Sequence, residues 1–226
     1  MSLSHQNIPS NLERMYPMNP TKPKILTTVN MNFEDLEDET TVRCAKFDTN
    51  PKKGSTLREI TFEECIFENV SFQDTLFIRF DFVDVIFKNC DLSNMKLEER
   101  FLNRVIFEEC KMNGTNFIDA TLKDVHFKNC HTKYLNFADA RLTSFKIENS
   151  ELIGATFQDT KIKNLTLEKV DLTESEFIHT PLAGVDLSTC ELGKTSFDFD
   201  SLRGVTVDLV QCPKLVSLLG VHIKDI

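Results

Sequence analysis

The sequence predicts an all-β fold in which the chain winds into a four-sided parallel β-helix. Three observations support this prediction. A large apolar residue returns at every fifth position, a smaller residue precedes it by two positions, and similar residues recur every twenty positions. Internal repetition at a short, fixed period is typical of solenoid proteins, whose coils stack along one axis.

The period of five runs from Leu57 to Val207 without a change of phase, and only Thr132 interrupts the series of large apolar residues. On an α-helix five residues advance about 500°, so the apolar side chains would point in all directions. On a flat strand successive fives alternate between the two faces, and half of these side chains would meet water. The pattern therefore predicts a corner every five residues, which returns each apolar side chain to a central axis.

A second inward position lies two residues before each apolar one, and it usually holds Val, Ala, Thr, Ser or Cys. Residues two apart share one side of an extended segment, so both positions face the interior. Two charged residues, Arg100 and Asp200, occupy this position and predict a local bulge or a side chain that reaches the coil edge; the alternative is a distorted corner that marks a contact. The position also holds most of the cysteines: Cys65, Cys90, Cys110, Cys130 and Cys190.

The cysteines at 90, 110 and 130 are expected to stack one coil apart, within the Cα separation that a disulfide tolerates. Because Val, Ala, Ser and Thr fill the same position elsewhere, we expect the thiols to pack as small apolar groups. No spacing typical of a zinc site occurs.

The period of twenty fixes the number of sides. Related segments such as Val85–Cys90, Val105–Cys110 and Val125–Cys130 are twenty residues apart. One coil should therefore consist of four sides of five residues. No insertion shifts the phase, so we expect no projecting loops.

The regions outside the period suggest how the single domain begins and ends. Residues 1–30 are rich in Pro, Ser and Asn and are expected to form a poorly ordered arm. Residues 31–56 are expected to form an irregular N-terminal cap, residues 57–207 the β-helix, and residues 208–226 a C-terminal cap and dimerisation segment.

The C-terminal cap is predicted to contain a helix with Pro213 in its first turn and Gly220 at its end, followed by a short strand at Val221 and Ile223. This segment has more apolar residues than are needed to close a small square end. We therefore expect a homodimer through the C-terminal ends. The expected interface consists of Leu215, Val216, Leu218, Leu219, Val221 and Ile223.

The charge distribution limits the function classes. The net charge is −9, and residues 57–207 contain 26 acidic and 17 basic residues. Direct nucleic-acid binding is not expected, because phosphate contacts need a basic surface. No apolar run reaches membrane-spanning length and no charged-then-apolar leader opens the chain, so we expect a cytoplasmic protein without membrane association.

An enzyme is also not expected. His126, His131 and His179 should point outward with no assigned nucleophile or carboxylate partner, and no phosphate-binding loop or metalloprotease motif occurs. A packed rod offers no deep pocket for a substrate. We therefore assign no catalytic, cofactor-binding or metal-binding residues.

The pattern x-small-x-Leu/Phe-x resembles the pentapeptide-repeat family, whose members fold as right-handed quadrilateral β-helices. The tail from Leu202 through Gln211 to Val221 and the stretch Leu26–Glu39 are similar to Qnr-type and MfpA-like members. This resemblance implies a non-enzymatic DNA mimic that binds bacterial DNA gyrase or topoisomerase IV, both type II topoisomerases, and protects the enzyme from quinolones. The absence of projecting loops departs from the longer-looped Qnr members.

DNA mimicry requires a concentrated acidic surface. B-DNA of ~37 Å, the expected rod length, carries on the order of 22 charges, so the whole rod is too weakly charged to imitate it uniformly. The most acidic side contains four acids one coil apart, which are the expected topoisomerase-facing residues: Glu99, Asp119, Asp139 and Asp159. Two alternatives remain. Acidic residues can simply suit a corner turn, and the rod can be a general protein-interaction scaffold with another partner.

Overall fold

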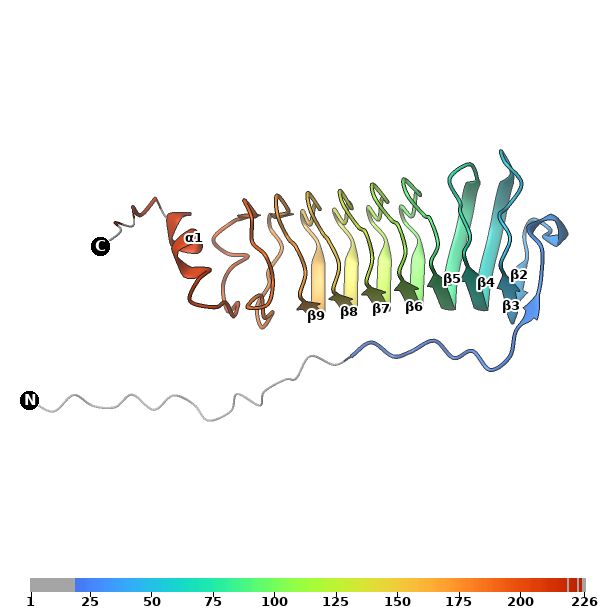
Figure 1. Cartoon of the computed structure of the whole chain (residues 1–226), viewed down its shortest axis with the longest axis horizontal. Helices are drawn as coiled ribbons and strands as arrows, with labels where there is room; N and C mark the ends of the chain where they lie inside the picture. Colours follow the sequence, from blue (N-terminus) through green and yellow to red (C-terminus); the bar gives the residue numbers. More distant parts are fainter. Residues whose placement is uncertain (1–18, 219, 223, 225–226) are drawn as a thin grey trace, which may run out of the picture.

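The computed structural model describes residues 19–218, 220–222 and 224, and it shows an elongated parallel β-solenoid of about eight coils (Figure 1). Successive strands of the main sheet pair in parallel, and from Thr41 onward each paired residue faces the residue twenty positions later. The main strands are β2 (Thr41–Arg43), β3 (Ala45–Phe47), β4 (Thr56–Glu68), β5 (Leu76–Lys88), β6 (Phe101–Glu108), β7 (Thr121–Lys128), β8 (Arg141–Glu148) and β9 (Lys161–Glu168). The four-sided coil of twenty residues is thereby confirmed.

The same offset continues beyond the main sheet. Strands β10 (Glu176–Phe177) and β11 (Ser196–Phe197) pair twenty residues apart, and isolated bridges extend the pattern to Asp186 and Thr206. The coils from Thr41 to Thr206 therefore contain no insertion that changes their length.

The corners recur every five residues, and most of them have a positive φ. This left-handed conformation is costly for most side chains, and Gly, Asn and Asp tolerate it best. We call the four corners of the coil A, B, C and D. Corner A contains Glu59, Arg79, Glu99, Asp119, Asp139, Asp159 and His179. Corner B contains Cys44, Glu64, Asp84, Arg104, Asp124, Ser144 and Asn164. Corner C contains Asn69, Asn89, Glu109, Asn129, Asn149 and Lys169, and corner D contains Asn94, Gly114, Tyr134, Gly154, Glu174 and Lys194.

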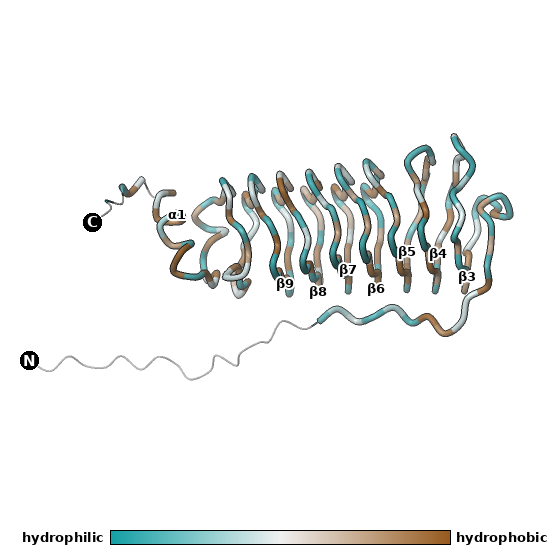
Figure 2. Tube along the Cα trace, viewed as in Figure 1, coloured by the Kyte–Doolittle hydropathy of each residue, from teal (hydrophilic) through white to brown (hydrophobic). Residues whose placement is uncertain are grey.

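The interior is a column of stacked apolar side chains. The ring centroids of Phe117 and Phe137 are 5.0 Å apart, and those of Phe137 and Phe157 are 4.8 Å apart, with nearly parallel planes. Thr132 is also buried, and its hydroxyl donates a hydrogen bond to the carbonyl of Glu151. Figure 2 shows the alternation of apolar and polar residues along each coil. The period of five therefore marks the interior as predicted.

The five cysteines at the small inward position are buried and not in disulfides. Their thiols lie near backbone carbonyls of the preceding coil; the sulfur of Cys90, for example, is 3.4 Å from the carbonyl oxygen of Phe67. Burial raises the pKa of the Cys65 thiol to about 11. These cysteines act as small core residues, as expected.

The two charged residues at inward positions do not enter the core. Asp200 is exposed and pairs with Arg203 at 3.3 Å, while Ser201 is buried in its place and accepts a hydrogen bond from the Thr180 N–H. The side chain of Arg100 turns to the coil edge, where its Nε lies 2.9 Å from the carbonyl oxygen of Glu98. The structure thus confirms the expectation of a bulge or an edge position.

The regular coils begin earlier in the sequence than predicted. A 3₁₀ helix, η1 (Phe33–Asp35), places the buried Phe33 ring 4.6 Å from Phe47. Strand β1 (Val29–Asn30) pairs with β3 at an offset of sixteen residues. Residues 31–56 were expected to be an irregular cap, but β2 and β3 within this range already pair with β4 in the regular register. Lys52 interrupts the series of apolar residues between Phe47 and Leu57, so the unbroken period begins only at Leu57 although the coil register begins at Thr41.

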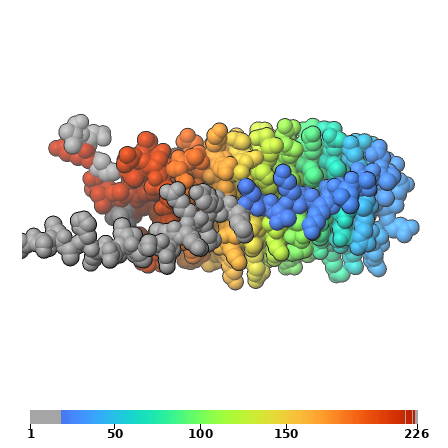
Figure 3. Space-filling model, turned by 90° about the horizontal axis from the view of Figure 1, so that it is seen from below, coloured from blue at the N-terminus to red at the C-terminus, as the bar shows by residue number. Residues whose placement is uncertain are grey.

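Residues 19–28, here called the strap, run in extended form along the outside of the rod. The N–H groups of Lys24 and Thr21 each donate a 2.8 Å hydrogen bond, to the carboxylates of Asp84 and Asp124 at corner B. Three extended residues span roughly 10 Å, which matches two coil spacings of about 4.8 Å. Figure 3 shows the strap lying across several coils. This part of the predicted arm therefore has a fixed place, and residues 1–18 lie outside the described residues.

The C-terminal cap contains one short helix, α1 (Cys212–Ser217), with Pro213 in its first turn as predicted. Val221 is not in a strand, and Leu219 and Ile223 of the predicted interface lie outside the described residues. No helix among the described residues has the length and apolar character needed to cross a membrane.

Candidate protein-interaction surfaces

The four predicted acids form one line along corner A, here called the acidic ladder. All four are exposed and have φ between 52° and 60°. The backbone N–H of each donates to a carbonyl of the next coil; the Asp119 N–H, for example, lies 3.0 Å from the Ala138 oxygen and that of Asp139 2.9 Å from the Gln158 oxygen. The coil repeat therefore holds the carboxylates one above another.

An arginine and a histidine lie at the two ends of the acidic ladder. Arg79, one coil before Glu99, pairs with Glu59 at 2.6 Å. His179, one coil after Asp159, places its Nδ1 3.3 Å from an Asp159 carboxylate oxygen. The uninterrupted acidic run therefore extends from Glu99 to Asp159.

The flanks of the acidic ladder differ. On one flank lie Glu98, Ile118, Ala138 and Gln158, of which only Glu98 is charged, and on the other lie the exposed bases Arg141 and Lys161. The acidic ladder is thus a single line with about one charge per 4.8 Å coil. One DNA strand carries one charge per ~3.4 Å of axis and the duplex one per ~1.7 Å, so the line approaches a single strand rather than the duplex.

The choice of acidic residues at corner A is not explained by the backbone alone. At corner C the residues that adopt the same left-handed conformation include Asn89, Asn129 and Asn149, with φ of 51°, 53° and 47°. Asn tolerates this conformation without charge. Stacked carboxylates repel one another, although water and salt weaken the repulsion. Corner A therefore carries an electrostatic cost that the neutral alternative at corner C avoids.

The C-terminal end of the rod presents the second candidate surface. Leu209 and Val210 are 88% and 85% exposed, and Phe199 is 62% exposed. Of the predicted interface residues, Leu218 and Val221 are about half exposed, whereas Leu215 and Val216 are partly buried and Leu215 packs against the core. Sequence reasoning did not identify Phe199, Leu209 and Val210. For Leu209 and Val210 the available signal was the loss of phase after Val207, and for Phe199 it was a place outside the two inward positions.

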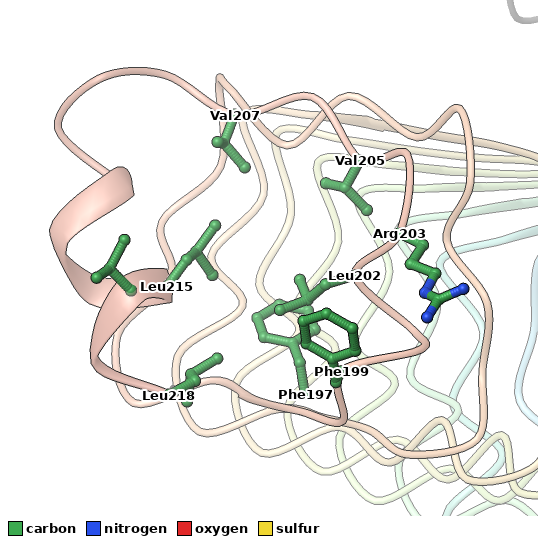
Figure 4. Close-up of a pocket in the computed structure, with 9 residues that line it drawn as sticks. Phe197, Phe199, Leu202, Arg203, Val205, Val207, Leu215 and Leu218 are labelled. Atoms are coloured by element: carbon green, nitrogen blue, oxygen red, sulfur yellow. The ribbon is translucent and has the colours of Figure 1, made fainter. Parts of the chain in front are cut away.

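A cavity of about 350 Å³ lies beside these exposed residues, between α1 and the last coil. Figure 4 shows Leu215 of the helix and Leu218, just after the helix, on one side of it, and Phe197, Leu202 and Val205 on the other. Phe197 is the last ring of the stacked column, 5.4 Å from Phe177. The cavity therefore continues the apolar interior, and α1 closes it only in part.

Gln211 joins α1 to the last complete coil. Its Nε2 donates to the carbonyl oxygens of Leu187 and Cys190, both at 2.8 Å, and its Oε1 accepts the Asp208 N–H at 2.9 Å. These carbonyls belong to the coil edge that a further coil would otherwise cover. Among the described residues, no group of three or more His, Cys, Asp and Glu side chains is placed to hold a metal ion.

Comparisons with known proteins agree with this architecture. Family patterns described as "Pentapeptide repeat region" and "Pentapeptide repeats (8 copies)" match residues 80–157 and 150–188. No curated protein matches the chain significantly.

Several solved structures are similar to parts of the chain. A pentapeptide-repeat protein from the thylakoid lumen of Arabidopsis thaliana is 24% identical over 40% of this chain and 63% of its own, with a TM-score of 0.38. Full-length QnrB1, a plasmid-mediated fluoroquinolone resistance protein, is 18% identical over 80% of this chain and all of its own, with a TM-score of 0.39. A trypsin-treated form of QnrB1 is 23% identical over 83% of this chain and 99% of its own, with a TM-score of 0.36. The five-residue repeat, the four-sided coil and the two family matches, which together cover residues 80–188, identify a pentapeptide-repeat protein.

Proposed function

We propose that the acidic ladder of this pentapeptide-repeat protein binds a bacterial type II topoisomerase, DNA gyrase or topoisomerase IV, at a surface that otherwise holds a DNA strand. The observation that supports this proposal is the choice of four successive acids at corner A, where corner C uses neutral Asn at four of its six positions. A line of fixed carboxylates suits a partner surface built to receive phosphates, because both ligands neutralise the same lysine and arginine side chains. In this role the protein protects the topoisomerase from quinolones and performs no chemistry.

The proposed topoisomerase complex is expected to be sensitive to salt. The four carboxylates of the acidic ladder are exposed, and interactions between exposed charges weaken as the Debye length falls from about 10 Å at 0.1 M salt to about 3 Å at 1 M. A homodimer through the C-terminal ends would present two copies of the acidic ladder, one in each half of the assembly. We propose this dimer as the binding form.

The experiment measures DNA supercoiling by purified gyrase, with and without a quinolone, as the protein is titrated. The ladder variant combines Asp119→Asn, Asp139→Asn and Asp159→Asn, which removes three charges and keeps side chains that suit positive φ. We expect it to lose both inhibition and protection. The control combines Glu151→Gln, Asp171→Asn and Glu191→Gln, three acids that also pair one coil apart but on another side.

The control variant should act like the native protein, because its acids lie away from corner A, although it loses as many charges as the ladder variant. Equal loss in both variants would indicate a general effect of net charge and contradict a role for corner A. Equal melting temperatures measured by circular dichroism would show that the fold is intact in each variant.

The alternative function is a protein-interaction scaffold whose partner is not a topoisomerase. The observation that favours it is the position of Arg141 and Lys161 beside the acidic ladder, which reduces the negative potential there. Absence of any effect on gyrase and topoisomerase IV at micromolar protein would favour this alternative.

A further inference from the structure

The backbone ladder that joins successive coils is broken at one place on the side between corners D and A. Strand β5 begins at Leu76, yet its pairing with the following coil begins only at Phe82, opposite Leu102. Residues 76–80 pair with β4 on one edge. Within the described chain, no backbone hydrogen bond joins their other edge to residues 96–100.

The later coils show which hydrogen bonds are missing. The N–H groups of Leu97, Phe117 and Phe137 each donate to the carbonyl nineteen residues later, at 2.7–2.8 Å. The equivalent bond from Phe77 to Lys96 is absent. Two further backbone hydrogen bonds are absent, from the Arg79 N–H to the Glu98 carbonyl and from the Lys96 N–H to the Thr75 carbonyl. The next coil has both counterparts, from Glu99 to Ile118 and from Asn116 to Met95.

Two side chains compensate for part of this break. The carboxylate of Asp81 accepts the Phe101 N–H at 2.8 Å, and the Nε of Arg100 donates to the Glu98 carbonyl at 2.9 Å. In later coils backbone groups make these contacts; the Thr121 N–H, for example, bonds to the Arg100 carbonyl. The break is therefore built into the sequence, and it explains why an arginine stands at an inward position that usually holds a small residue.

The remaining unpaired backbone groups face a slot of about 490 Å³ between the two coils. They include the N–H groups of Phe77 and Lys96 and the carbonyl of Thr75. The apolar part of its lining comes from Phe72, Leu76, Phe77 and Met95, of which Leu76 is 54% exposed. Asp74 and Lys96 contribute charges of opposite sign, so the slot has no preference for an anion or a cation.

We propose that this slot binds an extended segment of a partner protein, which adds as a strand to the free edge of β5. Only a polypeptide backbone offers donors and acceptors at strand spacing to both walls of the slot. An apolar side chain of the segment would lie against Leu76 and Met95, and the balanced charges require no charged motif. An exposed, unpaired strand edge is a template for such pairing, and its free N–H and C=O groups supply most of the affinity.

The probe is a fluorescent peptide with the sequence of residues 74–82 of this chain, because that segment pairs with the equivalent edge of the preceding coil. Its binding to the full chain is measured by fluorescence anisotropy. Lys96→Ala keeps the unpaired N–H, whereas Lys96→Pro removes it and no other backbone bond. We expect saturable binding to the native protein and to Lys96→Ala, and about five- to tenfold weaker binding to Lys96→Pro, as befits one hydrogen bond.

Absence of saturable binding to the native protein would overturn the proposal, and so would equal affinity of the alanine and proline variants. Binding only to a chain that starts at Asn19 would instead assign the slot to residues 1–18 of this chain. Self-association in light scattering that Lys96→Pro abolishes would assign it to a second copy. A Leu76→Asp variant with unchanged melting temperature should also weaken binding, which tests the apolar contact separately.

Discussion

The two ends of the rod cover the apolar interior in different ways. A solenoid exposes its apolar interior at each end and must cover it. At the N-terminal end the buried Phe33 ring packs on Phe47 and within 6.2 Å of Phe67 and Phe72, and the strap holds this end along the outside of the coils. At the C-terminal end α1 leaves a cavity, and Leu209 and Val210 remain exposed. The interior is thus covered by a buried ring at one end and only in part at the other, which supports the proposal that the C-terminal end forms the dimer interface.

The largest effect is expected from the exposed pair at the C-terminal end. The double substitution Leu209→Asp and Val210→Asp should convert a dimer into a monomer, measured by light scattering at micromolar concentration. Each side chain contributes about 1.5–3 kcal/mol when buried, and a two-fold interface contains each twice, so the dissociation constant should rise at least about a hundredfold. The free energy of unfolding of the monomer should hardly change. A native protein that is monomeric at this concentration would contradict the assignment of this end.

At the N-terminal end we expect a substitution to lower stability without changing the oligomeric state. Phe33→Ala should lower the free energy of unfolding by about 3–5 kcal/mol, because it removes a buried aromatic ring and leaves a cavity above Phe47. Urea denaturation followed by circular dichroism measures this loss. The oligomeric state of the folded protein should be unchanged. A loss below about 1 kcal/mol would show that the end is not sealed by this ring.

A smaller effect is expected where the strap meets corner B. Asp84 is 5% exposed, bonds to Arg104 at 2.6 Å and accepts the Lys24 N–H. Asp84→Ala should lower stability by about 1–3 kcal/mol, because it leaves the guanidinium without its partner. It should also speed cleavage by trypsin after Lys24, which is followed by Ile25. Asp124→Ala, which removes one exposed hydrogen bond, is the matched control and should have the weaker effect.

The carboxylate of Asp84 also predicts that the stability of the fold depends on pH. Burial alone would raise the pKa of Asp84, but hydrogen bonds from Arg104 and the Lys24 N–H, together with the positive charge of Arg104, lower it below the ordinary 3.8. The folded protein therefore holds this proton less tightly than the unfolded chain. The stability it supplies is complete above the unfolded pKa and is lost as the pH falls through the folded pKa. Unchanged acid sensitivity of Asp84→Ala would contradict this role.

The smallest effect is expected from the hydrogen-bonded part of the C-terminal cap. Gln211→Ala should lower the free energy of unfolding by about 1–2 kcal/mol, because the carbonyls of Leu187 and Cys190 lose their donor. Gln211→Glu keeps the size but replaces the donor with a carboxylate, and should destabilise at least as much. Equal stability of all three proteins would show that water replaces the amide at these carbonyls.

The period of five by itself determined the interior of this protein. It predicted the stacked Phe117, Phe137 and Phe157, the twenty-residue coil and the packing of the cysteines, because each of these depends only on which residues point inward. It also predicted the positions of the four acids, since corner A follows from the same count.

The tertiary structure decided what no local pattern encodes. The strap on Asp84 and Asp124 joins residues 60 and 103 positions apart, and the break beside β5 occurs although Phe77 keeps the period. The loss of phase after Val207 places Leu209 and Val210 outside the interior, but whether α1 covers them depends on where the helix lies across the end of the rod. In each case the physical reason is that contacts between distant segments, rather than the polarity of a single residue, determine which groups are paired and which face the solvent.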